Sequence, residues 1–203
     1  MHFLFLPSIL ILIWIILHNV KRSKRLSKES SDTFWENEAK ANNTRKQDIS
    51  GLNYISIDNT SLPYGISKQP NIIEIEDKIK SLSSKKILNL TGITNTELKS
   101  KYGVANLEEL SSYDENFTLL VRLLHQWGNA LYQNDYIDES KQVFEYAISI
   151  GSDITATYCT LANIYIGQDS IASIDQLLDS ASTLNSLSKN SIINKLNNIR
   201  DSY

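Results

Sequence analysis

The 203-residue sequence predicts an all-α protein built from helical hairpins, on three observations. From residue 114 onward, apolar side chains recur at helical spacing in successive segments that are separated by Gly or Asn-Asp turns. Two of these segments match when the sequence is shifted by 34 positions, and a fixed shift of this size is typical of stacked repeats. A strongly apolar stretch at the N-terminus is the third observation, and it predicts one further, membrane-spanning helix.

Residues 1–20 are predicted to form a transmembrane anchor. The segment from Phe3 to Leu17 is apolar except at Pro7 and Ser8, and with its flanks it approaches the roughly 20 residues that a spanning helix needs. A basic cluster follows at Lys21, Arg22, Lys24, Arg25 and Lys28, which places the N-terminus outside and the rest of the chain in the cytoplasm. A cleaved signal peptide is disfavoured, because no Lys or Arg precedes the apolar run and no small-x-small cleavage site follows it.

Residues 21–70 are predicted to form a juxtamembrane basic segment, an amphipathic helix and a linker. Ser31 or Asp32 is suited to cap a helix that runs to about Gln47. The aromatic pair Phe34-Trp35 is expected either to lie at the lipid headgroups or to dock the helix onto the soluble domain. The segment from 51 to 65 is expected to be extended or coil, since Pro63 disfavours helical geometry in the residue before it.

Residues 71–113 are predicted to form short helices. Pro70 opens the first, in which Ile72, Ile73, Ile75, Ile79 and Leu82 recur near helical spacing. A second is expected over about 84–89, and a third runs from a cap at Thr94 or Asn95 to Tyr102, where Gly103 stops it. One or two further turns are expected from Asn106. Since two hairpins are fewer than a stable array needs, we expect these helices to pack on the first hairpin.

Residues 114–187 are predicted to form two hairpins, and residues 188–203 a capping helix. Asp114 is expected to begin the first helix, the Asn134-Asp135 pair makes the turn, and the second helix spans 138–150 before Gly151. Asp153 or Thr155 is expected to cap the next helix, which reaches Ile166, and its partner covers 171–184. The segment 189–203 has one apolar face, and such a polar terminal helix covers the last open face of a stacked array.

The spacing of the two matched segments resembles the tetratricopeptide repeat. The shift places Leu124, Trp127, Gly128, Leu131, Ser140, Phe144 and Ala147 opposite Tyr158, Leu161, Ala162, Tyr165, Ile174, Leu178 and Ala181. In the resemblance, Gly128 and Ala162 are the small residues at which paired helices touch, whereas Ser140 and Ile174 replace the usual alanine. The whole chain also resembles uncharacterised single-span repeat proteins of Gram-positive anaerobic bacteria, in the stretches 34–38, 41–45, 85–92 and 101–103.

The resemblance implies a groove lined by the first helix of each hairpin. The implied groove residues are Arg122, His125, Gln126, Asn129, Tyr132, Gln133, Thr160, Asn163 and Ile166. Asn129 and Asn163 are the favoured pair, because a carboxamide both donates and accepts and can therefore bracket a peptide backbone. The alternative is that both side chains simply face water. The family members that grip C-terminal carboxylates have lysine where this chain has His125 and Cys159, so that mode is not implied.

The remaining composition predicts neither catalysis nor a cofactor. The three histidines have no metal-ligand spacing with Cys or carboxylates, and no phosphate-binding glycine loop or nucleophile motif occurs. Cys159, the one cysteine, has no basic partner nearby in sequence and is expected to pack rather than react. Residues 21–50 carry a net charge of +3 and residues 51–203 carry −6, which favours contact of the basic segment with lipid and disfavours nucleic acid as a partner.

These expectations lead to a membrane-anchored cytoplasmic adaptor that binds a protein or peptide, with no small-molecule substrate, no metal and no cofactor. A structural subunit of a membrane protein complex is the first alternative. The second, less favoured alternative is a membrane-tethered DNA-binding regulator, because residues 85–102 have the outline of a helix-turn-helix. The second helix of that motif carries only Lys99 and Lys101 as cations, so a structural connector is preferred.

Overall fold

The computed structural model describes Lys28 and residues 31–203, and within these residues it is helical with no strand. The predicted anchor over 1–20 and most of the basic cluster lie outside the described residues. None of the helices in the described part is both long enough and apolar enough to cross a membrane. The described residues form two compact units, one holding 31–48 with Thr94–Leu107, the other holding Ile49–Ile93 with Glu108–Tyr203.

The first unit is held together by polar contacts around α3 (Asn95–Tyr102) and the short 3-10 helix η1 (Val104–Asn106). A helix over 31–42 precedes them, and its Glu38 forms an ion pair with Lys99 and accepts a hydrogen bond from the Thr96 hydroxyl at 2.7 Å. The buried Asn106 side chain donates to the backbone carbonyls of Gln47 (2.8 Å) and Tyr102 (2.7 Å). These bonds fix the segment 43–48 on η1.

The ends of α3 form as the sequence predicts. Thr94 caps the helix through a capping box, in which its hydroxyl accepts from the Glu97 N–H and the Glu97 carboxylate accepts from the Thr94 N–H. Gly103 follows the helix with φ +86°, and a side chain there would come within 2.6 Å of the Arg45 carbonyl oxygen. Glycine is therefore needed at this position both for its backbone angle and for space.

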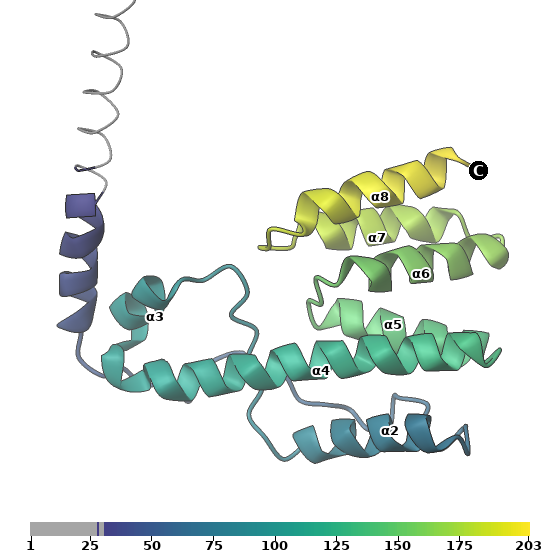
Figure 1. The fold of residues 1–203 in the computed structure, drawn as a ribbon, viewed down its shortest axis with the longest axis horizontal. Helices are drawn as coiled ribbons and strands as arrows, with labels where there is room; N and C mark the ends of the chain where they lie inside the picture. The colour runs from purple at the N-terminus through teal and green to yellow at the C-terminus, as the bar shows by residue number, and fades with distance from the viewer. Residues whose placement is uncertain (1–27, 29–30) are drawn as a thin grey trace, which may run out of the picture. The chain divides into compact units, whose positions relative to one another are not determined.

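The second unit contains α2 (Pro70–Leu82), α4 (Leu107–Gln133), α5 (Ile137–Ser149), α6 (Thr155–Gly167), α7 (Ala172–Ser182) and α8 (Lys189–Asp201). Helices α4 to α7 form two antiparallel hairpins, α4 with α5 and α6 with α7 (Figure 1). Helix α8 packs against both α6 and α7. Asp135 (φ +63°) and Asp169 (φ +54°) make the turns within the hairpins, and Gly151 (φ +89°) lies between the hairpins.

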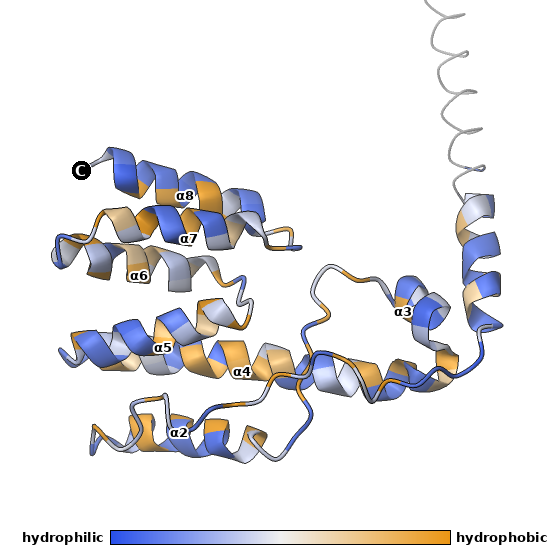
Figure 2. Cartoon of the chain, turned by 180° about the vertical axis from the view of Figure 1, so that it is seen from behind, coloured by the Kyte–Doolittle hydropathy of each residue, from blue (hydrophilic) through white to orange (hydrophobic). Residues whose placement is uncertain are grey.

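Two apolar clusters form the core of this unit. The first joins α2 and the preceding coil, through Ile57 and Leu62, to α4 and α5. The second joins α5, α6 and α7 to Ile192 and Leu196 of α8. Coloured by hydropathy, the helices show apolar stripes between polar surfaces, and α8 is mostly hydrophilic (Figure 2). Of the helices predicted over 71–113, α2 packs on the first hairpin as predicted, whereas α3 belongs to the first unit. Helix α8 covers the last face, as predicted.

Three predicted helix boundaries are wrong. Helix α4 begins at Leu107 and continues without a break through Asp114, because no helix-breaking residue lies between them and Leu110 is fully buried. The expected boundary between residues 113 and 114 therefore falls inside a helix. The helix of the first unit ends at residue 42 instead of Gln47. Neither Asp153 nor Thr155 caps α6, whose N-cap position is occupied by Ile154.

The helix expected over 84–89 is also wrong, since residues 86–90 are extended. This segment lies along α4, where Leu88 N–H donates to the Tyr113 carbonyl (3.2 Å) and Leu90 N–H to the Asp114 carboxylate (2.9 Å). Asp114 thus accepts from a neighbouring segment instead of capping a helix. Because its first helix does not form, the helix-turn-helix outline over 85–102 is not present in the described residues.

Candidate binding groove

The first helices of the two hairpins are joined by one polar contact. The Nδ1 atom of His125, on α4, lies 3.0 Å from the hydroxyl oxygen of Thr157, which is fully buried on α6. On its other side, the Nε2 atom of His125 lies 2.9 Å from the Asn129 side-chain nitrogen, one turn further along α4. Two of the predicted groove residues, His125 and Asn129, are therefore in contact, and His125 links them to the next hairpin.

The donor and acceptor roles in this cluster depend on the tautomer of His125. With the Asn129 amide nitrogen facing it, Nε2 accepts, and the neutral ring then carries its proton on Nδ1 and donates to the Thr157 hydroxyl. Burial lowers the pKa of His125, which favours the neutral ring. In this arrangement His125 uses one donor of Asn129 and leaves its carbonyl oxygen unused.

The other predicted groove residues differ in exposure. Five of them are exposed, and these are Arg122, Gln126, Tyr132, Gln133 and Asn163. Thr160 is half-buried, as are His125 and Asn129. Ile166 is buried in the second apolar cluster, so its assignment to the groove is corrected. The family spacing places position 166 on the groove face, but here the last turn of α6 packs that side chain into the core.

The surroundings of Arg122 differ from those of His125. It lines a shallow cavity of about 250 Å³ together with Asp114, Glu115, Thr118 and Leu119, all from the first half of α4. Two of these lining residues are carboxylates, so the cavity beside Arg122 is acidic in composition.

Cys159 behaves as a packing residue. It is half-buried on α6, and burial raises the pKa of its thiol, although Lys195 of α8 acts in the opposite direction. A thiol whose pKa is raised carries little thiolate near neutral pH and is a poor nucleophile. Within the described residues, no three His, Cys, Asp or Glu side chains lie together as metal ligands do.

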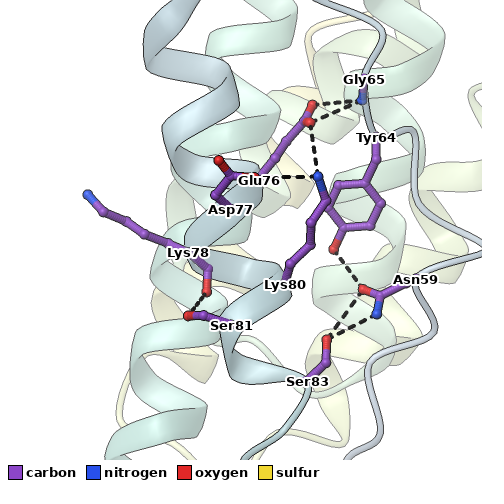
Figure 3. Close-up of polar contacts among 9 residues, drawn as sticks. All are labelled: Asn59, Tyr64, Gly65, Glu76, Asp77, Lys78, Lys80, Ser81 and Ser83. Carbon is purple, nitrogen blue, oxygen red and sulfur yellow. Dashed lines mark hydrogen bonds and ion pairs between the residues drawn. The ribbon is translucent and has the colours of Figure 1, made fainter.

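A second polar cluster, around Glu76 of α2, was not predicted from the sequence. The Glu76 carboxylate is almost fully buried and accepts from the Gly65 N–H at 3.0 Å, and the Lys80 ammonium lies 3.9 Å away (Figure 3). Burial raises the pKa of Glu76. Next to it, the Tyr64 ring stacks on Trp127 with 4.9 Å between centroids. The cluster holds the coil before α2 against the buried face of α4. Its role is therefore structural and differs from that of a ligand site.

The sequence contained only a weak signal for this cluster. Glu76 follows Ile72 at helical spacing, so a buried position on α2 could be inferred, but its partner is a backbone N–H 11 residues earlier in a coil.

No family model matches the chain, and comparisons with curated proteins and with solved structures also find no match.

Proposed function

We propose that the chain is a membrane-anchored cytoplasmic adaptor, whose tetratricopeptide-like hairpins bind a protein or peptide in the groove along α4 and α6. The observation that supports the proposal is the contact of His125 with Thr157, because it joins α4 to α6, the helices that carry Asn129 and Asn163. Exposed polar side chains accompany Asn129 on α4, as Gln126 and Gln133 do, whereas Thr160 beside Asn163 is half-buried. This surface suits recognition of a polar peptide backbone better than it suits catalysis.

The membrane part of the proposal rests on the sequence of residues 1–28. An apolar stretch of near-spanning length followed at once by five basic residues favours an anchor with the soluble units in the cytoplasm. A reporter that is active only in the cytoplasm, fused after Tyr203, tests this orientation. Activity in the membrane fraction supports it, whereas an inactive but intact fusion contradicts the orientation.

Crosslinking in native membranes, followed by identification of the crosslinked proteins, tests the groove. The double variant Asn129→Ala/Asn163→Ala should lose a specific partner while keeping its helical content and melting temperature. The matched control is Asn53→Ala/Asn71→Ala, which removes two exposed carboxamides from the coil and from α2. If the groove variant keeps every partner that the control keeps, the groove assignment is wrong, and a structural subunit of a membrane complex becomes the better explanation.

A further inference from the structure

The helix over 31–42 is attached to the first unit through its second half, where Glu38 makes its ion pair with α3 and Ala41 is buried. The first turns of this helix extend beyond α3 (Figure 1). They carry two aromatic side chains, Phe34 and Trp35, which are 53% and 64% exposed. The two rings contact each other edge to face, with 5.4 Å between centroids. The structure therefore leaves the pair exposed and does not dock it onto the first unit.

The carboxylates of this helix add little net negative charge beside the two rings. Positions on a helix advance by about 100° per residue, so Glu36 lies on the side of the helix opposite to the midpoint of the rings. There it forms an ion pair with Lys40 at 2.8 Å. Asp32 lies on the flank of the helix, about 110° from the same midpoint. Glu38 lies on the side of the rings, but its ion pair with Lys99 balances its charge.

We propose that Phe34 and Trp35 insert into the headgroup layer of the membrane that holds the anchor, and that they hold the first unit on the bilayer surface. This inference rests on the anchor of the proposed function and adds a second attachment to it. The 13 residues of 21–33 separate the predicted anchor from Phe34, a distance of about 20 Å as a helix or about 45 Å if fully extended. Five of them are cations, which anionic headgroups attract. This connection lets the helix lie along the bilayer and is too short to carry the pair far from it.

The chemistry of the pair favours a lipid interface over a protein partner. A tryptophan side chain joins an apolar ring to a polar N–H, and such side chains are enriched at the headgroup level of membranes. A helix that docks in the groove of a protein instead repeats its apolar residues at three- and four-residue spacing. Here the next positions along the face are Glu38 and Ala41, and the first unit already uses both. The apolar patch is therefore only two side chains long, which suits shallow insertion into a bilayer.

Depth-dependent quenching of Trp35 fluorescence tests the insertion. The full chain with Trp14→Phe is reconstituted into vesicles of phosphatidylcholine and phosphatidylglycerol. Part of the phosphatidylcholine carries a spin label, either on the headgroup or near the end of the acyl chain. Trp127 is fully buried in the second unit and gives a constant background, which the variant Trp14→Phe/Trp35→Phe measures. We expect the headgroup label to lower the Trp35 emission about twofold, and the acyl-chain label to lower it less.

Amide exchange of the membrane-bound chain gives a second measurement with matched variants. The variant Phe34→Gln/Trp35→Gln should exchange about fivefold faster over 31–37 than the wild type, because the bilayer no longer shields the first turns of the helix. The control is Val104→Gln, which replaces another exposed apolar residue of the same unit and should exchange there as the wild type does. Since all three replaced side chains are exposed, both variants should keep the melting temperature of the wild type.

The outcomes separate this inference from the proposed function. If alkaline carbonate washes the chain off the vesicles, the predicted anchor fails and this inference fails with it. If the chain stays in the vesicles but neither label quenches Trp35, the anchor stands and the insertion of the pair is wrong. Stronger quenching by the acyl-chain label would place the ring in the hydrocarbon core and would also overturn the inference. A protein crosslink that Phe34→Gln/Trp35→Gln loses, with Trp35 unquenched in the parent chain, would assign the pair to a protein partner instead.

Discussion

Replacing Gly128 by alanine tests how closely the helices of the first hairpin approach. A Cβ at this position would lie 2.4 Å from Cε1 of Phe144 and 2.7 Å from Cδ1 of the same ring. Phe144 is fully buried, so its ring has no free space and α4 must move away from α5. Alanine gains about 1 kcal/mol over glycine in a helix interior, whereas overpacking costs about 1–3 kcal/mol. Because this overlap is severe, we expect a net loss of about 1–2 kcal/mol.

Thermal unfolding followed by far-UV circular dichroism measures this loss, which corresponds to a fall in melting temperature of about 2–8 °C. The control is Gly167→Ala at the end of α6, where no heavy atom lies within 4 Å of the added Cβ. That variant should be unchanged or more stable by up to about 1 kcal/mol. Adding Phe144→Leu to the Gly128→Ala variant should recover part of the loss. A Gly128→Ala variant as stable as Gly167→Ala would refute the close packing of α4 on α5.

Three further predictions concern single polar residues. Glu76→Gln removes a buried charge but keeps an oxygen for the Gly65 N–H, so near pH 7 it should match the wild type or exceed its stability by about 1 kcal/mol. Because the folded-state pKa of Glu76 is raised, the wild type loses stability as pH rises from about 4.3 through that pKa. Urea unfolding should therefore show that the stability of Glu76→Gln relative to the wild type increases over this pH range. His125, whose folded-state pKa is lowered, stabilises the fold above about pH 6.5 and loses this contribution as pH falls. His125→Gln should flatten the acidic limb of the urea-unfolding profile, and an unaltered limb would contradict the assignment. Thr94→Ala should weaken α3 by about 1 kcal/mol, seen as faster amide exchange over its last turn, and equal exchange rates would argue against the capping box.

Helix ends with a strong local cause were predictable from the sequence. Pro70 begins α2, Gly103 follows α3, and the Asn134-Asp135 pair turns the chain between α4 and α5. In each case the residue itself restricts or permits the backbone angle, so the position of the helix end depends little on tertiary contacts. Gly151 with φ +89° belongs to the same class.

Boundaries without such a residue required tertiary information. Asp114 is equally suited to cap a helix or to accept from a neighbouring segment, and the Leu90 N–H decides for the second. Ile87, Leu88 and Leu90 are all buried in an extended segment, and so short an apolar run does not distinguish a helix from an extended chain. The wrong boundary at Asp114 and the wrong helix over 84–89 have the same origin. Leu90, in the segment where that helix was expected, donates the hydrogen bond that Asp114 accepts.

The proposed groove shows the same limit at the level of single atoms. The resemblance to the repeat, with its shift of 34 residues, selected Asn129 and Asn163 as equivalent positions. It could not reveal that they are chemically unequal, because the difference comes from Thr157, which lies 32 residues after His125 and is completely buried. That hydroxyl orients the imidazole, and the imidazole in turn occupies a donor of Asn129. A peptide bound in the proposed groove should therefore lose more affinity when its N–H facing Asn129 is methylated than when the carbonyl there is replaced, and it should show no such asymmetry at Asn163.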